Sequence, residues 1–323
     1  MNSQYRFEPG CNRSDTVHCY ALAMKAPSKI WLIHALLLAG FAALGLHAVD
    51  EPRNNFRFAI LGDRTGGAQP QIYGRVWREV DLMHPDFVIN VGDTIQGGKD
   101  ESAEEEWKAM RPIWARYNHY PLYFTPGNHD IWSDISRRLY EQESQRPSHY
   151  SFDFQDAHFT VLDTARAREL TPEETKFLAD DLEANKDKGP KFIFFHHPYW
   201  IGLLESETQD FELHRLARKY NVSHVISGHG HRFVRRVRDG IVYMEVGSSG
   251  GQMTSGLVRG EGFRDGRFYH WVWANVKGGK VSVTVKEIGG QMGEGRMFKA
   301  EDWDERGPQF EIDDPALSIV PET

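Results

Sequence analysis

The sequence has very little cysteine and no excess of basic charge. Its 2 cysteines, Cys11 and Cys19, both lie near the N-terminus, so the rest of the chain has neither disulfides nor thiolate metal ligands. The formal net charge is -8 at pH 7. General binding to nucleic acids or to anionic membranes usually requires a basic surface, so we expect neither kind of binding.

One apolar run, residues 30–46, stands near the N-terminus. Two lysines precede it, and residues 46–48 follow it as a loose match to a small-residue cleavage site. This layout predicts a secretory signal peptide at about residues 24–48, within an N-terminal extension of residues 1–48, and export to the periplasm or the extracellular space. The alternative is an uncleaved anchor that keeps the protein at a membrane through residues 30–46.

Past residue 48 the pattern predicts one domain, residues 49–290, and a polar, acidic C-terminal tail, residues 291–323. Within the domain, strand-like and helix-like stretches alternate at first, and mainly strands follow. The predicted strands are 56–61, 87–91, 122–125, 150–154, 158–162, 191–195, 222–227, 233–237, 241–246, 268–276 and 280–288, and the predicted helices are 72–83, 102–117, 172–185 and 211–220. This order indicates an α/β domain in which two β-sheets pack face to face.

Five short motifs with oxygen or nitrogen donors each follow a strand-like run. They are Gly62-Asp63, Gly92-Asp93, Gly127-Asn128-His129-Asp130, His196-His197-Pro198 and Gly228-His229-Gly230-His231. Each motif alone is weak, because Gly-Asp is a common turn and asparagine often caps a helix. Together, however, they stand at the C-terminal ends of predicted strands, where open α/β sheets bind ligands. Donors of this kind suit hard or borderline divalent metals, so the set predicts a two-metal site.

The motif set resembles that of the calcineurin-like metallophosphoesterase superfamily, over roughly residues 56–288. The resemblance implies a four-layer α/β/β/α sandwich with two mixed sheets, and a hydrolase that cleaves phosphate mono- or diesters with a metal-activated hydroxide. Two divalent or trivalent ions, of Mn, Fe, Zn or Mg, are implied as cofactors, with a small phosphorylated molecule as substrate. No nucleic-acid or protein partner is expected. The alternative is a degenerate domain that acts as a non-catalytic binding scaffold.

The resemblance also implies a role for each motif residue. The implied metal ligands are Asp63 and His231 at a first metal, Asn128, His196 and His229 at a second metal, and Asp93 as a bridge between the two. His196 is chosen over His197 because the family's ligand lies two residues before the proline. His129 is the implied catalytic histidine, which contacts the phosphate and protonates the leaving group, and Asp130 is expected to orient it.

One position departs from the family pattern. The family usually has a histidine two residues after the first aspartate, and this chain has Thr65 there. Purple acid phosphatases also lack that histidine but have a tyrosine three residues after the bridging aspartate, where this chain has Gln96. Whether Thr65 or Gln96 binds metal stays open, and we expect weaker binding of the first metal. Arg64 either reaches a substrate phosphate or forms a surface salt bridge.

Two further segments have open or weaker assignments. Residues 247–251, rich in glycine and serine, either line the substrate pocket or form a flexible turn. Tyr199 and Trp200 follow the histidine motif directly, so we expect them to form walls of the pocket.

Overall fold

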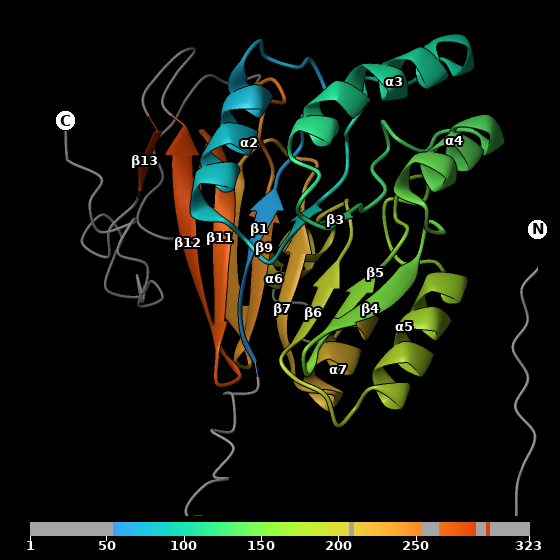
Figure 1. Ribbon diagram of the computed structural model, residues 1–323. Coiled ribbons are helices and arrows are strands. Elements are labelled where there is room, and N and C mark those ends of the chain that lie inside the picture. Colours follow the sequence, from blue (N-terminus) through green and yellow to red (C-terminus); the bar gives the residue numbers. More distant parts are fainter. Residues whose placement is uncertain (1–53, 207–209, 254–264, 289–294, 298–323) are drawn as a thin grey trace, which may run out of the picture. The chain divides into compact units, whose positions relative to one another are not determined.

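The computed structural model describes residues 54–206, 210–253, 265–288 and 295–297 (Figure 1). The expected signal peptide or anchor and the residues from 298 onward lie outside this part of the chain. Within the described ranges, no helix is both long enough and apolar enough to cross a membrane.

Six strands form the first sheet, in the order β13-β12-β11-β1-β2-β3. The strands are β1 (Asn55–Leu61), β2 (Phe87–Asn90), β3 (Leu122–Tyr123), β11 (Tyr269–Lys277), β12 (Lys280–Ile288) and β13 (Gly295–Met297). β1, β2 and β3 are parallel, whereas β11 to β13 join the other edge of β1 in antiparallel fashion. The sheet is therefore mixed, and its parallel half carries the first three motifs.

Seven strands form the second sheet, in the order β10-β8-β9-β7-β6-β5-β4. They are β4 (Tyr150–Phe154), β5 (Ala157–Val161), β6 (Lys191–Phe194), β7 (Val222–Ser227), β8 (Phe233–Arg238), β9 (Ile241–Val246) and β10 (Asp265–Gly266). The central four, β5, β6, β7 and β9, are parallel, and antiparallel strands flank them on both sides.

Helices cover the outer faces of both sheets (Figure 1). The helices are α2 (Ile72–Met83), α3 (Asp100–Arg116), α4 (Asp134–Ser144), α5 (Pro172–Ala184), α6 (Trp200–Glu205) and α7 (Glu212–Lys219). Side chains of α2, α3 and α4 pack in one core cluster with the outer face of the first sheet, and those of α5, α6 and α7 pack on the second. The predicted α/β/β/α sandwich is confirmed.

Aromatic side chains fill the space between the two sheets. The Phe58 ring stacks on Phe87 at 4.8 Å between centroids and meets Phe159 and Phe192 edge-on, each at 5.4 Å. Such pairs stabilise a core beyond the burial of their area, by about 0.5–1.5 kcal/mol each. This rigid interior fixes the strand ends from which the motif residues project.

The sequence predicted helix 72–83 and most of the strands, but it missed the helices α4 and α6 and the short strands β10 and β13. α4 buries two serines and one tyrosine, Ser136, Tyr140 and Ser144, so it shows no apolar stripe in the sequence. Its start is fixed instead by a capping box at Ser133. α6 has only 6 residues, too few to show helical periodicity. β3 is also shorter than expected.

Candidate metal centre

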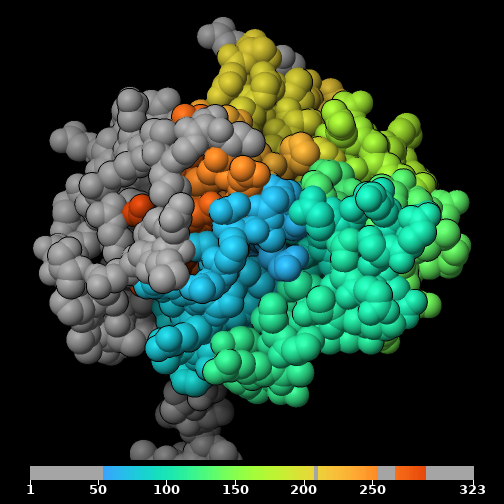
Figure 2. All heavy atoms as spheres, turned by 90° about the horizontal axis from the view of Figure 1, so that it is seen from above, coloured from blue at the N-terminus to red at the C-terminus, as the bar shows by residue number. Residues whose placement is uncertain are grey.

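The motif residues follow the C-terminal ends of strands in both sheets. Asp63 follows β1 and Asp93 follows β2 in the first sheet, whereas His196 follows β6 and His229 follows β7 in the second. Figure 2 looks down on the molecule from above the tips of these strands and shows parts of the chain coloured blue, green, yellow and orange meeting there. Segments that are distant in sequence thus place their polar side chains at one edge, as the sequence predicted.

One group of donors consists of Asp93, His196 and His229, whose ligand atoms lie within 4.8 Å of one another. His196 Nε2 lies 3.2 Å from Asp93 Oδ2, 3.3 Å from His229 Nδ1 and 3.1 Å from Asn128 Oδ1. The other ring nitrogen of His196 donates to the carbonyl oxygen of Val91 at 2.8 Å. That contact turns Nε2 toward the other donors, as outer contacts of metal-binding histidines do.

The other group consists of Asp63, Asp93 and His231, also within 4.8 Å. His231 Nε2 lies 3.6 Å from Asp63 Oδ2, and its Nδ1 donates to the Gln252 carbonyl at 2.6 Å. Asp63 Oδ2 accepts from the backbone N–H of His229 at 2.6 Å. Asp63 Oδ1 is buried and has no hydrogen-bond partner among the residues that the structure describes. A buried carboxylate oxygen of this kind needs a partner, and a cation would be one.

Asp93 belongs to both groups, and Gly127 allows the third motif to approach it closely. It has a positive φ of 55°, and its Oδ1 accepts from the backbone N–H of His129 at 2.9 Å. A Cβ atom on Gly127 would lie 2.2 Å from that Oδ1. Glycine at this position therefore lets the third motif close over the shared carboxylate.

Burial and mutual charge set the pKa values of these side chains. Burial raises the pKa of Asp63 well above its usual range, and the Asp93 charge adds to the rise while His196 opposes it. Burial also acts to raise the pKa of Asp93, but the charge and hydrogen bond of His196 outweigh it and hold that pKa below its usual range. Burial lowers the pKa of His229 to about 4. Close carboxylates beside imidazole nitrogens are a donor set that fits divalent cations.

His129 and Asp130 lie near the shared carboxylate and bond to different backbone groups. The His129 ring Nδ1 donates to the backbone carbonyl of Gln96. Asp130 accepts instead from the backbone N–H groups of Thr94 at 2.8 Å, Ile95 at 3.2 Å and Gly127 at 3.0 Å. The Asp130 carboxylate thus contacts loop amides, and the orientation of His129 by Asp130 stays a prediction. Asp130 ties together the loops after β2 and β3.

Thr65 and Gln96 contact each other. The Thr65 hydroxyl, which is fully buried, donates to Gln96 Oε1 at 2.7 Å, and the backbone N–H of Gly67 donates to the same oxygen at 3.1 Å. The two side chains at the position of the family's missing ligand thus form a hydrogen bond. Arg64 donates to the Thr94 carbonyl at 3.0 Å and lies over the Tyr73 ring, 6.0 Å from its centroid.

The segment 247–251 is a buried support for Asp63, which neither of its two predicted roles anticipated. All five of its residues are buried. The backbone N–H groups of Ser249 and Gly251 each donate to the Asp63 carbonyl at 3.0 Å, and Ser249 Oγ accepts from Gly62 N at 2.8 Å. These contacts fix the loop that carries the first aspartate.

Trp200 is a core residue and not a pocket wall. It is fully buried, and its indole N–H donates to Ser227 Oγ at 3.1 Å.

His197 has a contact that the sequence did not predict. Its Nδ1 donates to the Thr164 carbonyl at 2.7 Å, and its ring centroid lies 4.2 Å from that of His229. A backbone acceptor leaves no trace in a motif, so the sequence offered no signal for that contact.

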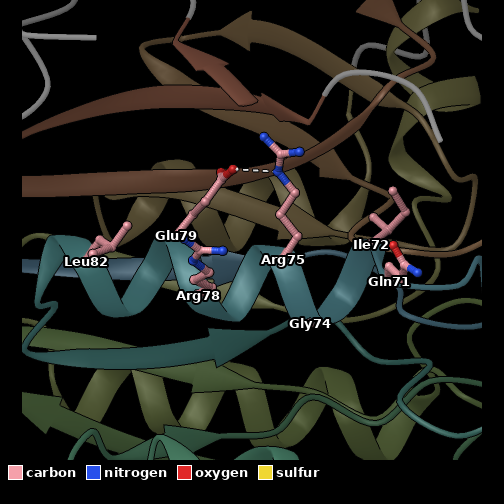
Figure 3. Close-up of a pocket in the computed structure, with 7 residues that line it drawn as sticks. All are labelled: Gln71, Ile72, Gly74, Arg75, Arg78, Glu79 and Leu82. Atoms are coloured by element: carbon pink, nitrogen blue, oxygen red, sulfur yellow. Dashed lines mark hydrogen bonds and ion pairs between the residues drawn. The ribbon is translucent and has the colours of Figure 1, made fainter. Parts of the chain in front are cut away.

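A cavity of about 620 Å³ lies along α2 (Figure 3). Its described lining residues are Gln71, Ile72, Gly74, Arg75, Arg78, Glu79 and Leu82. Arg75 and Glu79 pair within it at 3.1 Å. None of the metal donors is among these residues, so the cavity is separate from the candidate metal centre.

The two-sheet sandwich, with its metal-donor side chains at the C-terminal ends of the strands, is the fold of the metallophosphatase class. More particularly, a family model described as calcineurin-like phosphoesterase matches residues 56–233, and the chain belongs to that family. In solved structures, the fold is similar to a purple acid phosphatase from yellow lupin, with a TM-score of 0.56 and 15% identity over 74% of this chain and 52% of that one. It is also similar to GAP50, an anchor in the inner membrane complex of Plasmodium, with a TM-score of 0.51 and 14% identity over 80% of this chain and 91% of that one.

The chain is also similar in sequence to two curated relatives. The chain is 26% identical to purple acid phosphatase 23 of Arabidopsis thaliana, over 51% of this chain and 47% of the relative. It is also 26% identical to a probable glycerophosphodiester phosphodiesterase, GpdQ, of Arcobacter nitrofigilis, over 54% of this chain and 66% of the relative. The chain thus spans less than two-thirds of either relative.

Proposed function

We propose that this protein is a metal-dependent phosphoesterase with a two-metal centre. The observation that carries the proposal is the pair of donor groups that share Asp93. In such a centre Asp63 and His231 would hold one ion, Asn128, His196 and His229 would hold the other, and Asp93 would contribute to both. Oxygen and nitrogen donors without thiolate suit Mn, Fe, Zn or Mg ions.

Ions bound there would supply a hydroxide near neutral pH and compensate the charge that develops on a phosphate. The chain's own residues do the rest. Val91 and Gln252 fix the orientation of the His196 and His231 rings through their carbonyl groups. With its Nδ1–H bonded to the Gln96 carbonyl, His129 has Nε2 free to act, and this nitrogen would give its proton to a leaving oxygen when the ring carries a proton on both nitrogens.

The substrate we propose is a small phosphate ester. The named relatives include phosphatases and a probable phosphodiesterase, so both monoesters and diesters are reasonable substrates. The net charge of -8 argues against nucleic acid as the substrate, because nucleic-acid binding usually uses a basic surface. We further propose export directed by residues 24–48, which N-terminal sequencing of the protein recovered from expressing cells would test.

A phosphate-release screen tests the proposal. The purified protein, stripped of metal and reconstituted separately with Mn, Fe, Zn or Mg, is assayed against aryl monoesters and diesters. We expect turnover that depends on added metal and that is lost in the Asp93→Ala protein. Turnover that persists without metal, or an absence of turnover in a preparation shown to contain two ions per chain, would contradict the proposal.

The competing function is a binding scaffold without catalysis. Thr65, in place of the usual histidine ligand, is the observation that favours it, and GAP50, which has a similar fold, is described as an anchor. Against it, the six other predicted ligands and His129 are all present. A scaffold would bind metal weakly or not at all, and the metal content of the purified protein separates the two readings.

A further inference from the structure

The turn that carries two of the proposed ligands has an unfavourable backbone conformation. His229 has a φ of 77° and His231 a φ of 48°, both in the left-handed region that non-glycine residues rarely adopt. Such residues cost free energy and persist only where surrounding contacts hold them. His229 has one such contact, through its backbone N–H to Asp63. The His231 ring donates to the Gln252 carbonyl. Arg232, the next residue along the chain, holds the end of the turn through an ion pair.

Arg232 forms an ion pair with a buried glutamate that no motif contains. Glu245, near the end of β9, is fully buried, and its Oε2 accepts from Arg232 Nε at 3.0 Å. Its Oε1 has no hydrogen-bond partner within the described ranges and faces Gly230, where a Cβ atom would lie 2.0 Å from it. The Glu245 carboxylate therefore lies directly against the middle of the turn and is bonded to its C-terminal end. A buried charge is costly unless it is paired.

We propose that Glu245 and Arg232 are a positioning pair that holds the 229–231 turn in the shape that binds metal. The proposal rests on the metal centre of the proposed function. Loss of the pair should weaken the group of Asp63, Asp93 and His231 more than the other group. Arg232 follows His231 directly, and Gly247 N donates to the Arg232 carbonyl at 2.9 Å, so the pair acts at the His231 end of the turn. His229 keeps its contacts with Asp63 and with the His196 and His197 rings.

Glu245→Gln tests the pair because it removes the charge and keeps the size of the side chain. The matched control is Glu205→Gln, which breaks an ion pair of the same length, 3.0 Å to Arg236, on the exposed surface. Metal-free proteins are titrated with Mn²⁺ by calorimetry at pH 8. Burial raises the pKa of Glu245 to about 7, so its carboxylate is mainly ionised at that pH. His231→Ala and His229→Ala identify which binding step belongs to which donor group.

We expect Glu245→Gln to weaken the step assigned to His231 by about 10- to 100-fold, the usual effect of losing an outer contact of a metal ligand. The step assigned to His229 should change by less than about threefold, and Glu205→Gln should change neither. Equal losses at both steps, or none at either, would overturn the proposal. If Glu245→Gln does not fold, Arg232→Gln removes the half-exposed partner and should give the same selective loss. Wild-type protein that binds no Mn²⁺ would instead contradict the proposed function.

Discussion

The two donor groups share Asp93 but differ in how well the rest of each group is enclosed. In the group of His196 and His229, His196 is fully buried and lies within 3.3 Å of three other donor atoms. In the group of Asp63 and His231, the His231 nitrogen stands 3.6 Å from Asp63, and the position of the family's usual histidine is taken by Thr65. The first group is thus the more completely built.

This difference between the two donor groups predicts which substitutions should affect one ion and which should affect both. A shared carboxylate serves both ions, so its loss should affect both. A side chain that serves one ion should affect mainly that ion. Thr65 and Gln96 form a hydrogen bond of 2.7 Å with each other at the position of the missing ligand. Asp63, His231 and the shared Asp93 are then left to hold that ion.

The largest effect is expected from Asp93→Ala. Because Asp93 contributes to both groups, its removal should abolish binding of both metals and bring phosphate release to the limit of detection. Metal content by mass spectrometry and turnover of an aryl phosphate measure the two effects. An Asp93→Ala protein that retains one tightly bound ion would show that the two groups are independent.

His129→Ala should separate catalysis from metal binding. His129 is absent from both donor groups, so the variant should bind two ions with unchanged affinity. Its turnover should fall by about 10²–10⁴-fold, the usual contribution of a general acid. Rate measurements with esters of increasingly acidic leaving groups check the role, since a leaving group that needs no proton should recover much of the rate. A uniform loss across leaving groups would contradict it.

Thr65→His should strengthen the less complete group. A histidine there can add a ligand, and we expect the weaker metal-binding step to tighten at least tenfold, since even outer contacts of ligands change affinity by about 10–100-fold. Thr65→Val is the matched control, because it loses the hydroxyl that bonds Gln96 and adds no ligand. Equal affinities in the histidine and valine proteins would show that position 65 lies out of reach of the metal.

The smallest effect is expected at His158, which lies with two carboxylates outside both donor groups. Its contribution to stability shows what a buried histidine–carboxylate cluster does where no metal is proposed. His158 is buried between Asp153 and Asp181, at 2.8 Å from each. Burial acts to lower the pKa of His158, but hydrogen bonds to the two carboxylates outweigh it and raise that pKa. Protonated His158 therefore stabilises the fold fully below its unfolded pKa of about 6.5, and this contribution is lost as pH rises through the folded pKa.

His158→Asn should therefore destabilise the metal-free protein more at pH 5.5 than at pH 9. We expect a loss of about 1–3 kcal/mol at the lower pH, the usual cost of leaving a buried polar partner unsatisfied. Urea unfolding at both pH values measures it. A loss that does not depend on pH would show that His158 is neutral in the folded protein.

Residue patterns predicted the fold and the meeting of the donors better than they predicted contacts. Helical spacing gave Ile72–Met83, but α4 was missed because serines fill its buried face. The hydrogen bonds from three loop amides to Asp130 were not predicted, because backbone donors are the same at every residue and carry no sequence signal. Acceptors such as the Val91 and Gln96 carbonyls depend on the path of the backbone, which no motif records.

Titration of the metal-free wild-type protein with Mn²⁺ tests the central claim most directly. Two donor groups of unequal completeness around one shared carboxylate predict two binding steps, one tight and one weaker, and the Thr65→His protein should narrow the gap between them. A single step with one ion per chain, or two steps of equal affinity that Thr65→His leaves unchanged, would contradict the account.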